Sequence, residues 1–141
     1  MLAPLYVSSI IKRVTQTCIG MILKRLNEAR ILRIDKGITL DAPGIYAWTI
    51  EGVGCYIGKF TRKSRPLREY DKNVHRLING IAYRPQRPDG FRVVHRALAE
   101  ALTNGTTIEL RIISNENNGD LNALERYYID TIAWGGLNRT K

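Results

Sequence analysis

The fold is most strongly constrained by two strand-forming runs of residues on either side of a glycine turn. The first run, residues 44–50, reads GIYAWTI, and the second, residues 55–60, reads CYIGKF. Between them stands Gly52-Val53-Gly54. Aromatic and β-branched residues favour strands, and a short loop that contains glycine favours an antiparallel connection. We therefore expect a β-hairpin over residues 44–60.

The length of this loop decides which side chains share a face of the hairpin, because successive residues of a strand point to opposite faces. A two-residue turn would place Tyr46 and Tyr56 on opposite faces. A three-residue loop over residues 52–54 brings both tyrosines to the same face. We predict the three-residue loop, with Ile45 and Ile57 directed together into the core.

The remaining pattern predicts helices and one more strand around the hairpin. Apolar residues recur at helical spacing in four segments and alternate with polar residues in a fifth. The expected helices span 8–30, 64–79, 92–103 and 120–133, and the expected strand spans 107–113. The fold class is then α+β, with a small three-stranded mixed or antiparallel sheet flanked by helices. We divide the chain into an N-terminal helical extension, residues 1–40, packed on a domain of residues 41–141.

Positive charge is concentrated in the middle of the chain. The formal net charge is +9, and residues 59–96 hold eleven Lys and Arg against three acids, a net of +8. Such a cluster is typical of a protein that binds a polyanion, because Lys and Arg neutralise phosphates. We expect nucleic acid as the partner, with an anionic membrane surface as the alternative. The expected nucleic-acid contacts are Lys59, Arg62, Lys63, Arg65, Lys72, Arg76, Arg84, Arg87 and Arg92.

Cysteine usage and the first residues narrow the cellular setting. The two cysteines, Cys18 and Cys55, lie far apart, and neither belongs to a CxxC motif. This excludes a disulfide framework and a cysteine zinc site, and it favours a reducing compartment. The apolar runs at the start of the chain are interrupted by Lys12-Arg13 and Lys24-Arg25. They match neither a signal peptide nor a membrane span, so we expect a cytoplasmic protein.

Glu125 is unusual for its place on the last expected helix. At about 100° per residue, an apolar stripe is formed by Leu121, Tyr128, Ile129 and Ile132, and Glu125 falls within it. A carboxylate on a buried face is costly unless it is paired or binds a cation. The alternatives are therefore a salt bridge to a neighbouring arginine and a divalent metal ion held by one carboxylate.

The triplets Gly44-Ile45-Tyr46 and Tyr56-Ile57-Gly58, followed by a lone glutamate on a late helix, resemble the GIY-YIG nuclease family. The resemblance covers about residues 42–140. It implies a metal-dependent endonuclease that hydrolyses DNA phosphodiester bonds, with Mg²⁺, or Mn²⁺ as the alternative, bound by Glu125 in a one-metal mechanism. The two tyrosines of the triplets would orient or deprotonate the attacking water, and Tyr46 is the favoured base.

The same resemblance assigns roles to residues between and after these motifs. The family places its catalytic arginine four residues after a helix N-cap. With Ser64 as the cap this residue is Arg68, and Arg65 is the competitor; such an arginine would hold the scissile phosphate. Asn138 corresponds to the asparagine that follows the last helix in the family. His75, about two turns beyond the arginine, is a further catalytic candidate, and the alternatives in this region are Tyr83 and His95.

Two other functions are consistent with the sequence. One is a nucleic-acid-binding module that keeps the fold without cutting, and the other is a membrane-surface or partner-binding protein led by the helix over residues 8–30. For a nuclease, sequence preference would come from residues 1–40, from the loop 83–90, or from a second subunit, either another copy of the chain or a partner protein. This architecture favours a restriction-type or phage-borne nuclease over a repair subunit.

Overall fold

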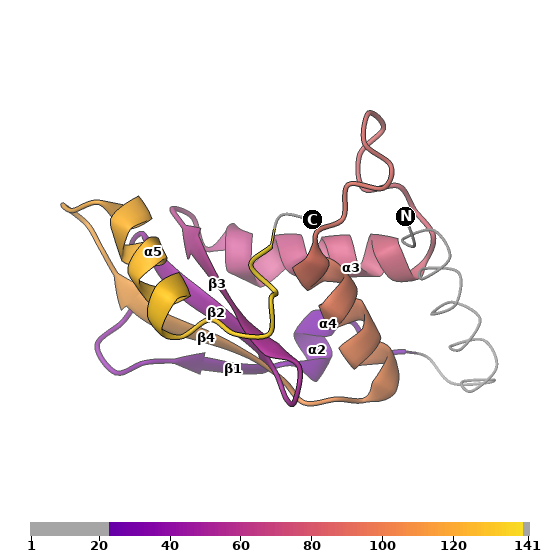
Figure 1. Ribbon diagram of the computed structural model, residues 1–141, viewed down its shortest axis with the longest axis horizontal. Coiled ribbons are helices and arrows are strands. Elements are labelled where there is room, and N and C mark those ends of the chain that lie inside the picture. The colour runs from indigo at the N-terminus through magenta and orange to yellow at the C-terminus, as the bar shows by residue number, and fades with distance from the viewer. Residues whose placement is uncertain (1–22, 140–141) are drawn as a thin grey trace.

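The computed structural model describes residues 23–139, and Figure 1 shows how their helices and strands are arranged. Most of the helix expected over residues 8–30 lies outside the described residues. The elements in chain order are α2 (Leu26–Ala29), β1 (Ile31–Ile34), β2 (Gly44–Ile50), β3 (Gly54–Phe60), the π-helical turn η1 (Arg65–Glu69), α3 (Tyr70–Ile78), α4 (Val93–Asn104), β4 (Ile108–Asn115) and α5 (Leu121–Thr131).

Four strands form one mixed sheet in the order β1-β4-β2-β3. Strand β2 is antiparallel to both β3 and β4, and β1 runs parallel to β4. The expected three-stranded sheet is therefore wrong by one strand, because residues 31–34, which we placed in the helical extension, form β1 at one edge. All four residues of β1 are exposed. A short strand without a buried face lacks the apolar alternation by which strands are recognised in a sequence.

Different helices cover the two faces of the sheet (Figure 1). Tyr46 and Trp48 of β2 belong to the larger core, which includes buried residues of α3 and α4. Ile45 and Ile57 lie together on the other face, against apolar residues of α5. This confirms that their side chains point together into the core. Because both faces of β2 are buried, its sequence is apolar nearly throughout.

The loop of the hairpin has three residues, as predicted, but it is displaced by one position. Strand β2 ends at Ile50, which pairs with Gly54, so the loop comprises residues 51–53 rather than 52–54. Gly52 has a φ angle of +74°. This left-handed conformation is one that glycine adopts without steric cost, which explains why the turn forms at this residue.

The displaced loop leaves the two tyrosines of the hairpin on one face. Tyr46 pairs with Gly58, and Trp48 pairs with Tyr56. Moving the loop by one residue shifts each cross-strand pair by an even number of positions, so the side chains keep their faces. The prediction that Tyr46 and Tyr56 share a face is therefore confirmed, and both belong to the larger core.

The expected helices after the hairpin are present, with ends within two residues of the predicted ones. The main difference lies at the start of the helix expected over residues 64–79, where Arg65–Glu69 forms a π-helical turn before α3 begins. Ser64 stands at its N-cap but makes no capping hydrogen bond with its side chain. A π turn inserts one residue into a helix and changes which side chains face a given direction.

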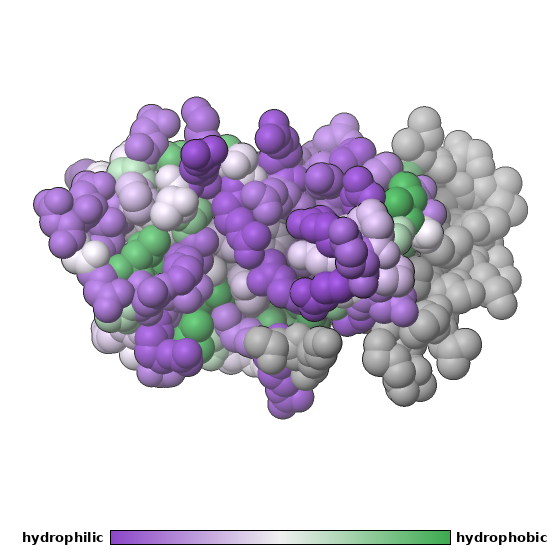
Figure 2. All heavy atoms as spheres, turned by 90° about the horizontal axis from the view of Figure 1, so that it is seen from above, coloured by the Kyte–Doolittle hydropathy of each residue, from purple (hydrophilic) through white to green (hydrophobic). Residues whose placement is uncertain are grey.

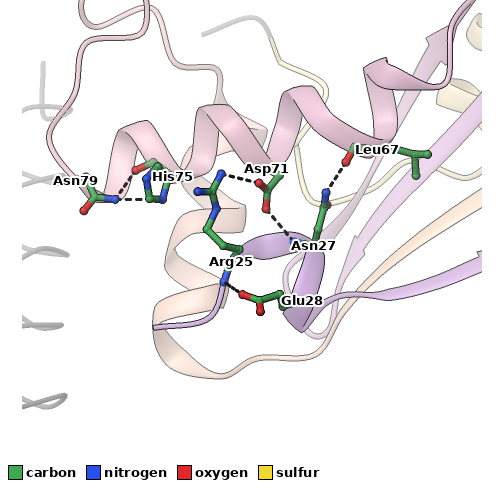
Figure 3. A network of polar contacts seen from close by, with 7 residues as sticks. All are labelled: Arg25, Asn27, Glu28, Leu67, Asp71, His75 and Asn79. Atoms are coloured by element: carbon green, nitrogen blue, oxygen red, sulfur yellow. Dashed lines mark hydrogen bonds and ion pairs between the residues drawn. The ribbon is translucent and has the colours of Figure 1, made fainter. Parts of the chain in front are cut away.

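Polar contacts hold α2 against α3, as Figure 3 shows. The guanidinium of Arg25 pairs with the carboxylate of Asp71 at 2.7 Å, and the backbone N–H of Asn27 donates to the same carboxylate at 3.0 Å. The side-chain amide of Asn27 donates to the carbonyl of Leu67. Together these contacts fix one flank of α3. Within residues 23–139, the structure has no helix long and apolar enough to cross a membrane.

Candidate active site

A cleft of about 640 Å³ lies where the end of β3, the turn η1 and the start of α5 meet. Residues far apart in the sequence line it, because the sheet and its helices bring their segments together at this edge. The chemically important members are two tyrosines, two arginines and two carboxylates: Tyr46, Tyr56, Arg65, Arg92, Glu69 and Glu125.

A third tyrosine, Tyr70, joins the two predicted ones behind the wall of the cleft. Its hydroxyl lies 2.5 Å from the hydroxyl of Tyr46, and its ring centroid lies 5.6 Å from that of Tyr46 and 6.2 Å from that of Tyr56. In the sequence, Tyr70 stands at helical spacing from Val74 and Leu77, on the apolar face of its helix. A tyrosine on such a face is most often a core residue, so the sequence contained no signal that its hydroxyl would reach the site.

Arg92 holds the hydroxyls of two of these tyrosines. It stands at the N-cap of α4 and donates from Nη1 to the hydroxyl of Tyr56 at 2.8 Å and from Nη2 to the hydroxyl of Tyr70 at 3.1 Å. Its guanidinium also lies 5.6 Å and 5.5 Å from the centres of these two rings. We expected Arg92 to contact nucleic acid directly. In the structure, Nη1 and Nη2 of Arg92 donate to the tyrosines, and Arg92 lines the cleft.

Burial controls the protonation of the three phenols. It is the main cause that raises the pKa of Tyr46, Tyr56 and Tyr70 above the ordinary value of about 10. The positive charge of Arg92 acts in the opposite direction on all three, but burial prevails. In the free protein these side chains are therefore neutral hydroxyls near pH 7. A tyrosine acting as a base here needs additional positive charge in the cleft.

Because Gly58 has no side chain, it leaves room for the ring of Tyr46. A Cβ atom at Gly58 would collide with Cζ and the hydroxyl oxygen of Tyr46. The glycine that ends the second triplet is therefore required by packing, because the phenol of the first triplet lies directly over its cross-strand partner.

Arg65, and not Arg68, is the arginine of η1 that lines the cleft. Arg65 forms an ion pair with Glu69 at 3.2 Å, and Arg68 is exposed and does not line this cleft. The expectation that Arg68 joins the tyrosines in one cleft is wrong. The π turn contributes to this, because it holds more residues per turn than an α-helix and so rotates Arg68, three residues on, farther from the side of Arg65.

Glu125 reaches the cleft from the first turns of α5. It is half-buried, next to Leu124, which packs against the sheet. Its carboxylate makes no hydrogen bond or ion pair with any other residue among 23–139, so the salt bridge that we considered is not formed within this part of the chain. The second carboxylate of the cleft, Glu69, was not foreseen, and it is paired with Arg65.

The donor set of the cleft limits the metal that it suits. Among residues 23–139, no group of three or more His, Cys, Asp or Glu side chains is close enough to hold one ion. A cation in the cleft would rest on Glu125 and take its other ligands from water and substrate oxygens. Mg²⁺ keeps several waters when it is bound through one or two carboxylates, so this site fits Mg²⁺ and does not resemble a zinc site.

Asn138 lies beside the cleft wall rather than in it. Its side-chain oxygen accepts from the N–H of Ile57 at 3.0 Å, and its side-chain nitrogen donates to the carbonyl of Ile57 at 2.8 Å. Ile57 separates Tyr56 from Gly58, both of which line the cleft. Asn138 therefore holds the backbone of β3 in place and is not among the lining residues, contrary to the expected catalytic role.

The structure does not bring the three candidates from the middle of the chain into the cleft. His75 lies on the flank of α3 that faces α2, near Asn79, as Figure 3 shows. Tyr83 packs its ring against Phe91 at 5.3 Å between centroids. His95 is fully buried and accepts from the backbone N–H of Arg92 at 3.0 Å. All three serve packing or local contacts.

The expected nucleic-acid contacts fall into two groups. Lys59, Arg62 and Arg65 line the cleft together with Arg92. Lys63 lies near it, 3.7 Å from the carboxylate of Asp41. The remaining members lie outside the cleft, on α3 and on the loop between α3 and α4: Lys72, Arg76, Arg84 and Arg87.

Comparisons of the chain with known protein families, with curated proteins and with solved structures gave no match. The evidence on function is therefore the arrangement of the side chains themselves.

Proposed function

We propose that this protein is a magnesium-dependent DNA endonuclease with a GIY-YIG-type site. The observation that carries the proposal is the convergence of Tyr46, Tyr56, an arginine and Glu125 in one cleft. These are the types of residue that the sequence resemblance demands, and they come from segments up to 79 positions apart. The role of the arginine passes from Arg68 to Arg65.

Each group suits one part of phosphodiester hydrolysis. A Mg²⁺ or Mn²⁺ ion bound through Glu125 would act as a Lewis acid on the phosphate and its leaving 3′ oxygen. Arg65 is half-exposed, so its guanidinium can exchange the carboxylate of Glu69 for two phosphate oxygens. Tyr46 lines the cleft, and its hydroxyl would orient the attacking water. The water forms the new bond to phosphorus, and the bond to the 3′ oxygen breaks.

The hydrogen bond between Tyr46 and Tyr70 would help Tyr46, once it is a phenolate, to take the proton of the attacking water. With extra positive charge in the cleft the pKa of Tyr46 falls, and Tyr70 can stabilise a phenolate there by donating its own proton. Arg92 supports the arrangement because it donates to the oxygen of Tyr70, which leaves the proton of Tyr70 for its bond to Tyr46. This geometry favours Tyr46 over Tyr56, whose oxygen already accepts from Arg92.

Cleavage of plasmid or phage DNA tests the proposal. The wild-type protein should cut in the presence of Mg²⁺ and stop when the metal is chelated. Glu125→Gln should abolish cutting while DNA binding is retained, and Glu51→Gln, in the exposed hairpin loop, is the matched control that should cut normally. Salt-sensitive DNA binding without cutting under any divalent metal would support a binding module instead. Binding to anionic liposomes and not to DNA would contradict both.

A further inference from the structure

A row of basic side chains follows one flank of the helix formed by η1 and α3. Arg68, Lys72 and Arg76 recur every four residues, a spacing that places side chains next to one another along a helix. Arg68 and Lys72 are exposed, and Arg76 is half-buried. The helix has two acids: Glu69 is paired with Arg65, and Asp71 points to the other flank, where Arg25 neutralises it (Figure 3). The row therefore presents positive charge to solvent.

The loop after α3 carries two more arginines on a stiff, paired backbone. Arg84 and Arg87 donate to each other's carbonyls at 3.3 Å and 3.1 Å, on either side of Pro85-Gln86. The N–H of Tyr83 donates to the carbonyl of Pro88 at 3.0 Å. Residues 83–88 thus form a narrow two-stranded ribbon with an exposed tip. Two prolines in six residues restrict its backbone further.

This ribbon is attached firmly at its base. Arg76, the last residue of the basic row, donates to the carbonyl of Ala82 at 3.4 Å. On the other side, Arg96 of α4 donates to the carbonyls of Phe91 at 2.7 Å and Asp89 at 3.4 Å. Figure 1 shows the loop standing away from the body of the protein, and Figure 2 shows hydrophilic side chains over most of the face from which it projects.

The helix runs from Arg65 in the cleft to Ile78, shortly before the ribbon. After the helix the chain turns back, and the base of the ribbon lies near the tyrosines of the cleft: the ring of Tyr83 is 5.9 Å from that of His95, which is 5.5 Å from that of Tyr70. The major groove of B-form DNA admits a two-stranded ribbon, and arginine makes bidentate hydrogen bonds to guanine there.

We propose that a DNA duplex lies along this flank, with phosphates on Arg68 and Lys72 and the 83–88 ribbon in the major groove on the same side as the cut. The ribbon then selects the sequence at which the protein binds. This inference rests on the proposed function for the position of the cut, but the contact between DNA and the ribbon does not depend on catalysis. It also gives Arg68, which does not line the cleft, a place on the DNA.

The test is hydroxyl-radical footprinting of the full chain, in the non-cutting Glu125→Gln background, on a duplex selected for tight binding. Arg84→Gln with Arg87→Gln should remove protection at one end of the footprint and weaken binding by roughly ten-fold for each arginine. Lys72→Gln should keep the footprint and reduce the slope of log affinity against log salt by about one. Arg126→Gln, an exposed arginine on α5, is the control and should change neither.

An unchanged footprint in the Arg84 and Arg87 double variant would overturn the inference. Equal or tighter binding to an RNA duplex of the same sequence would also overturn it, because the deep, narrow major groove of A-form RNA does not admit the ribbon. The two proposals fail separately. If the wild-type protein binds DNA with this footprint but never cuts, the proposed nuclease is contradicted and the ribbon contact stands. If the wild-type protein cuts DNA but the Arg84 and Arg87 double variant leaves the footprint unchanged, the ribbon contact is contradicted and the nuclease stands.

Discussion

Tyr46 and Gly58 face each other across the β2–β3 ladder, and the phenol ring of Tyr46 fills the space that a side chain at Gly58 would occupy. The first triplet therefore depends on the second for the position of its tyrosine. Two short motifs that look independent in the sequence form one packing unit, because the tyrosine ring lies flat over the glycine backbone.

Gly58→Ala should consequently displace the ring of Tyr46 and destabilise the fold by about 1–3 kcal/mol, the usual cost of overpacking a filled site. Urea unfolding measures the loss, and DNA cleavage should fall with it. In a Tyr46→Ala background the same substitution should cost much less, because the clash is gone. Additive effects in this double-mutant cycle would show that the two residues do not compete for space.

Arg92→Gln should weaken both the stability and the activity of the protein. The substitution leaves the hydroxyls of Tyr56 and Tyr70 without their charged donor, which typically costs about 1.5–3 kcal/mol for a hydrogen bond to a charged group. Arg92→Lys should restore part of the stability but little of the cleavage rate, because a lysine cannot serve two hydroxyls with a planar fork. Equal cleavage by the Gln, Lys and wild-type proteins would contradict a role in positioning the phenols.

The buried phenols should make the protein less stable in alkali. The pKa of Tyr46, Tyr56 and Tyr70 is raised in the folded state. The unfolded chain therefore loses these protons first, from about pH 10 upward, and the stabilisation that is complete below that pH decreases as the pH rises further. Tyrosinate absorbance should show three fewer ionised phenols in the folded protein than in urea at the same pH. Full ionisation without unfolding would contradict the buried cluster.

His95 should make the protein sensitive to acid. Burial, with the nearby charges of Arg92 and Arg65, lowers the pKa of His95 from 6.5 to about 3. Between these two pKa values the unfolded chain binds a proton at His95 and the folded protein does not. Stability should decrease from about pH 6.5 downward, by roughly 2 kcal/mol at pH 5. His95→Gln should flatten this dependence, and His75→Gln, on the flank of α3 that faces α2, is the control and should keep it. Urea midpoints at pH 7 and pH 5 make the comparison.

Asn138→Ala should loosen β3 without touching the cleft. It removes both hydrogen bonds to the backbone of Ile57, at a cost of about 1–3 kcal/mol. Hydrogen exchange of the Ile57 amide should accelerate, and cleavage should slow because Tyr56 and Gly58 flank this residue. Asn118→Ala, in the exposed loop before α5, provides a matched control. An unchanged exchange rate of the Ile57 amide would show that Asn138 does not hold the backbone of β3 in place.

The parts of this fold that were predictable from the sequence are those that local chemistry decides. The strand-forming residues of 44–50 and the glycine turn were enough to place Tyr46 and Tyr56 on one face. They did not locate the loop to the residue, because Gly52 and Gly54 offer two nearly equivalent positions for the turn. Glu125 was recognisable because an acid in an apolar stripe is unusual.

The parts that were missed depend on features that sequence periodicity does not record. With the π turn over Arg65–Glu69, Arg65 rather than Arg68 lines the cleft. A helical pattern read at 100° per residue does not predict such a turn. Tyr70 and Arg92 belong to the site because they form hydrogen bonds with residues of other helices and strands. Strand β1 has no buried face, so its membership of the sheet becomes visible only through its pairing with β4.

The tail after α5 does more than follow the last helix. Trp134 exchanges backbone hydrogen bonds with Cys55. The side-chain amide of Asn138 bonds the backbone N–H and C=O of Ile57, as a residue of a neighbouring strand would. An edge strand with free N–H and C=O groups is a template for pairing with foreign strands. By occupying these groups the tail discourages aggregation through β3, so the strand that carries Tyr56 is closed along its edge while Tyr56, Gly58 and Lys59 still line the cleft.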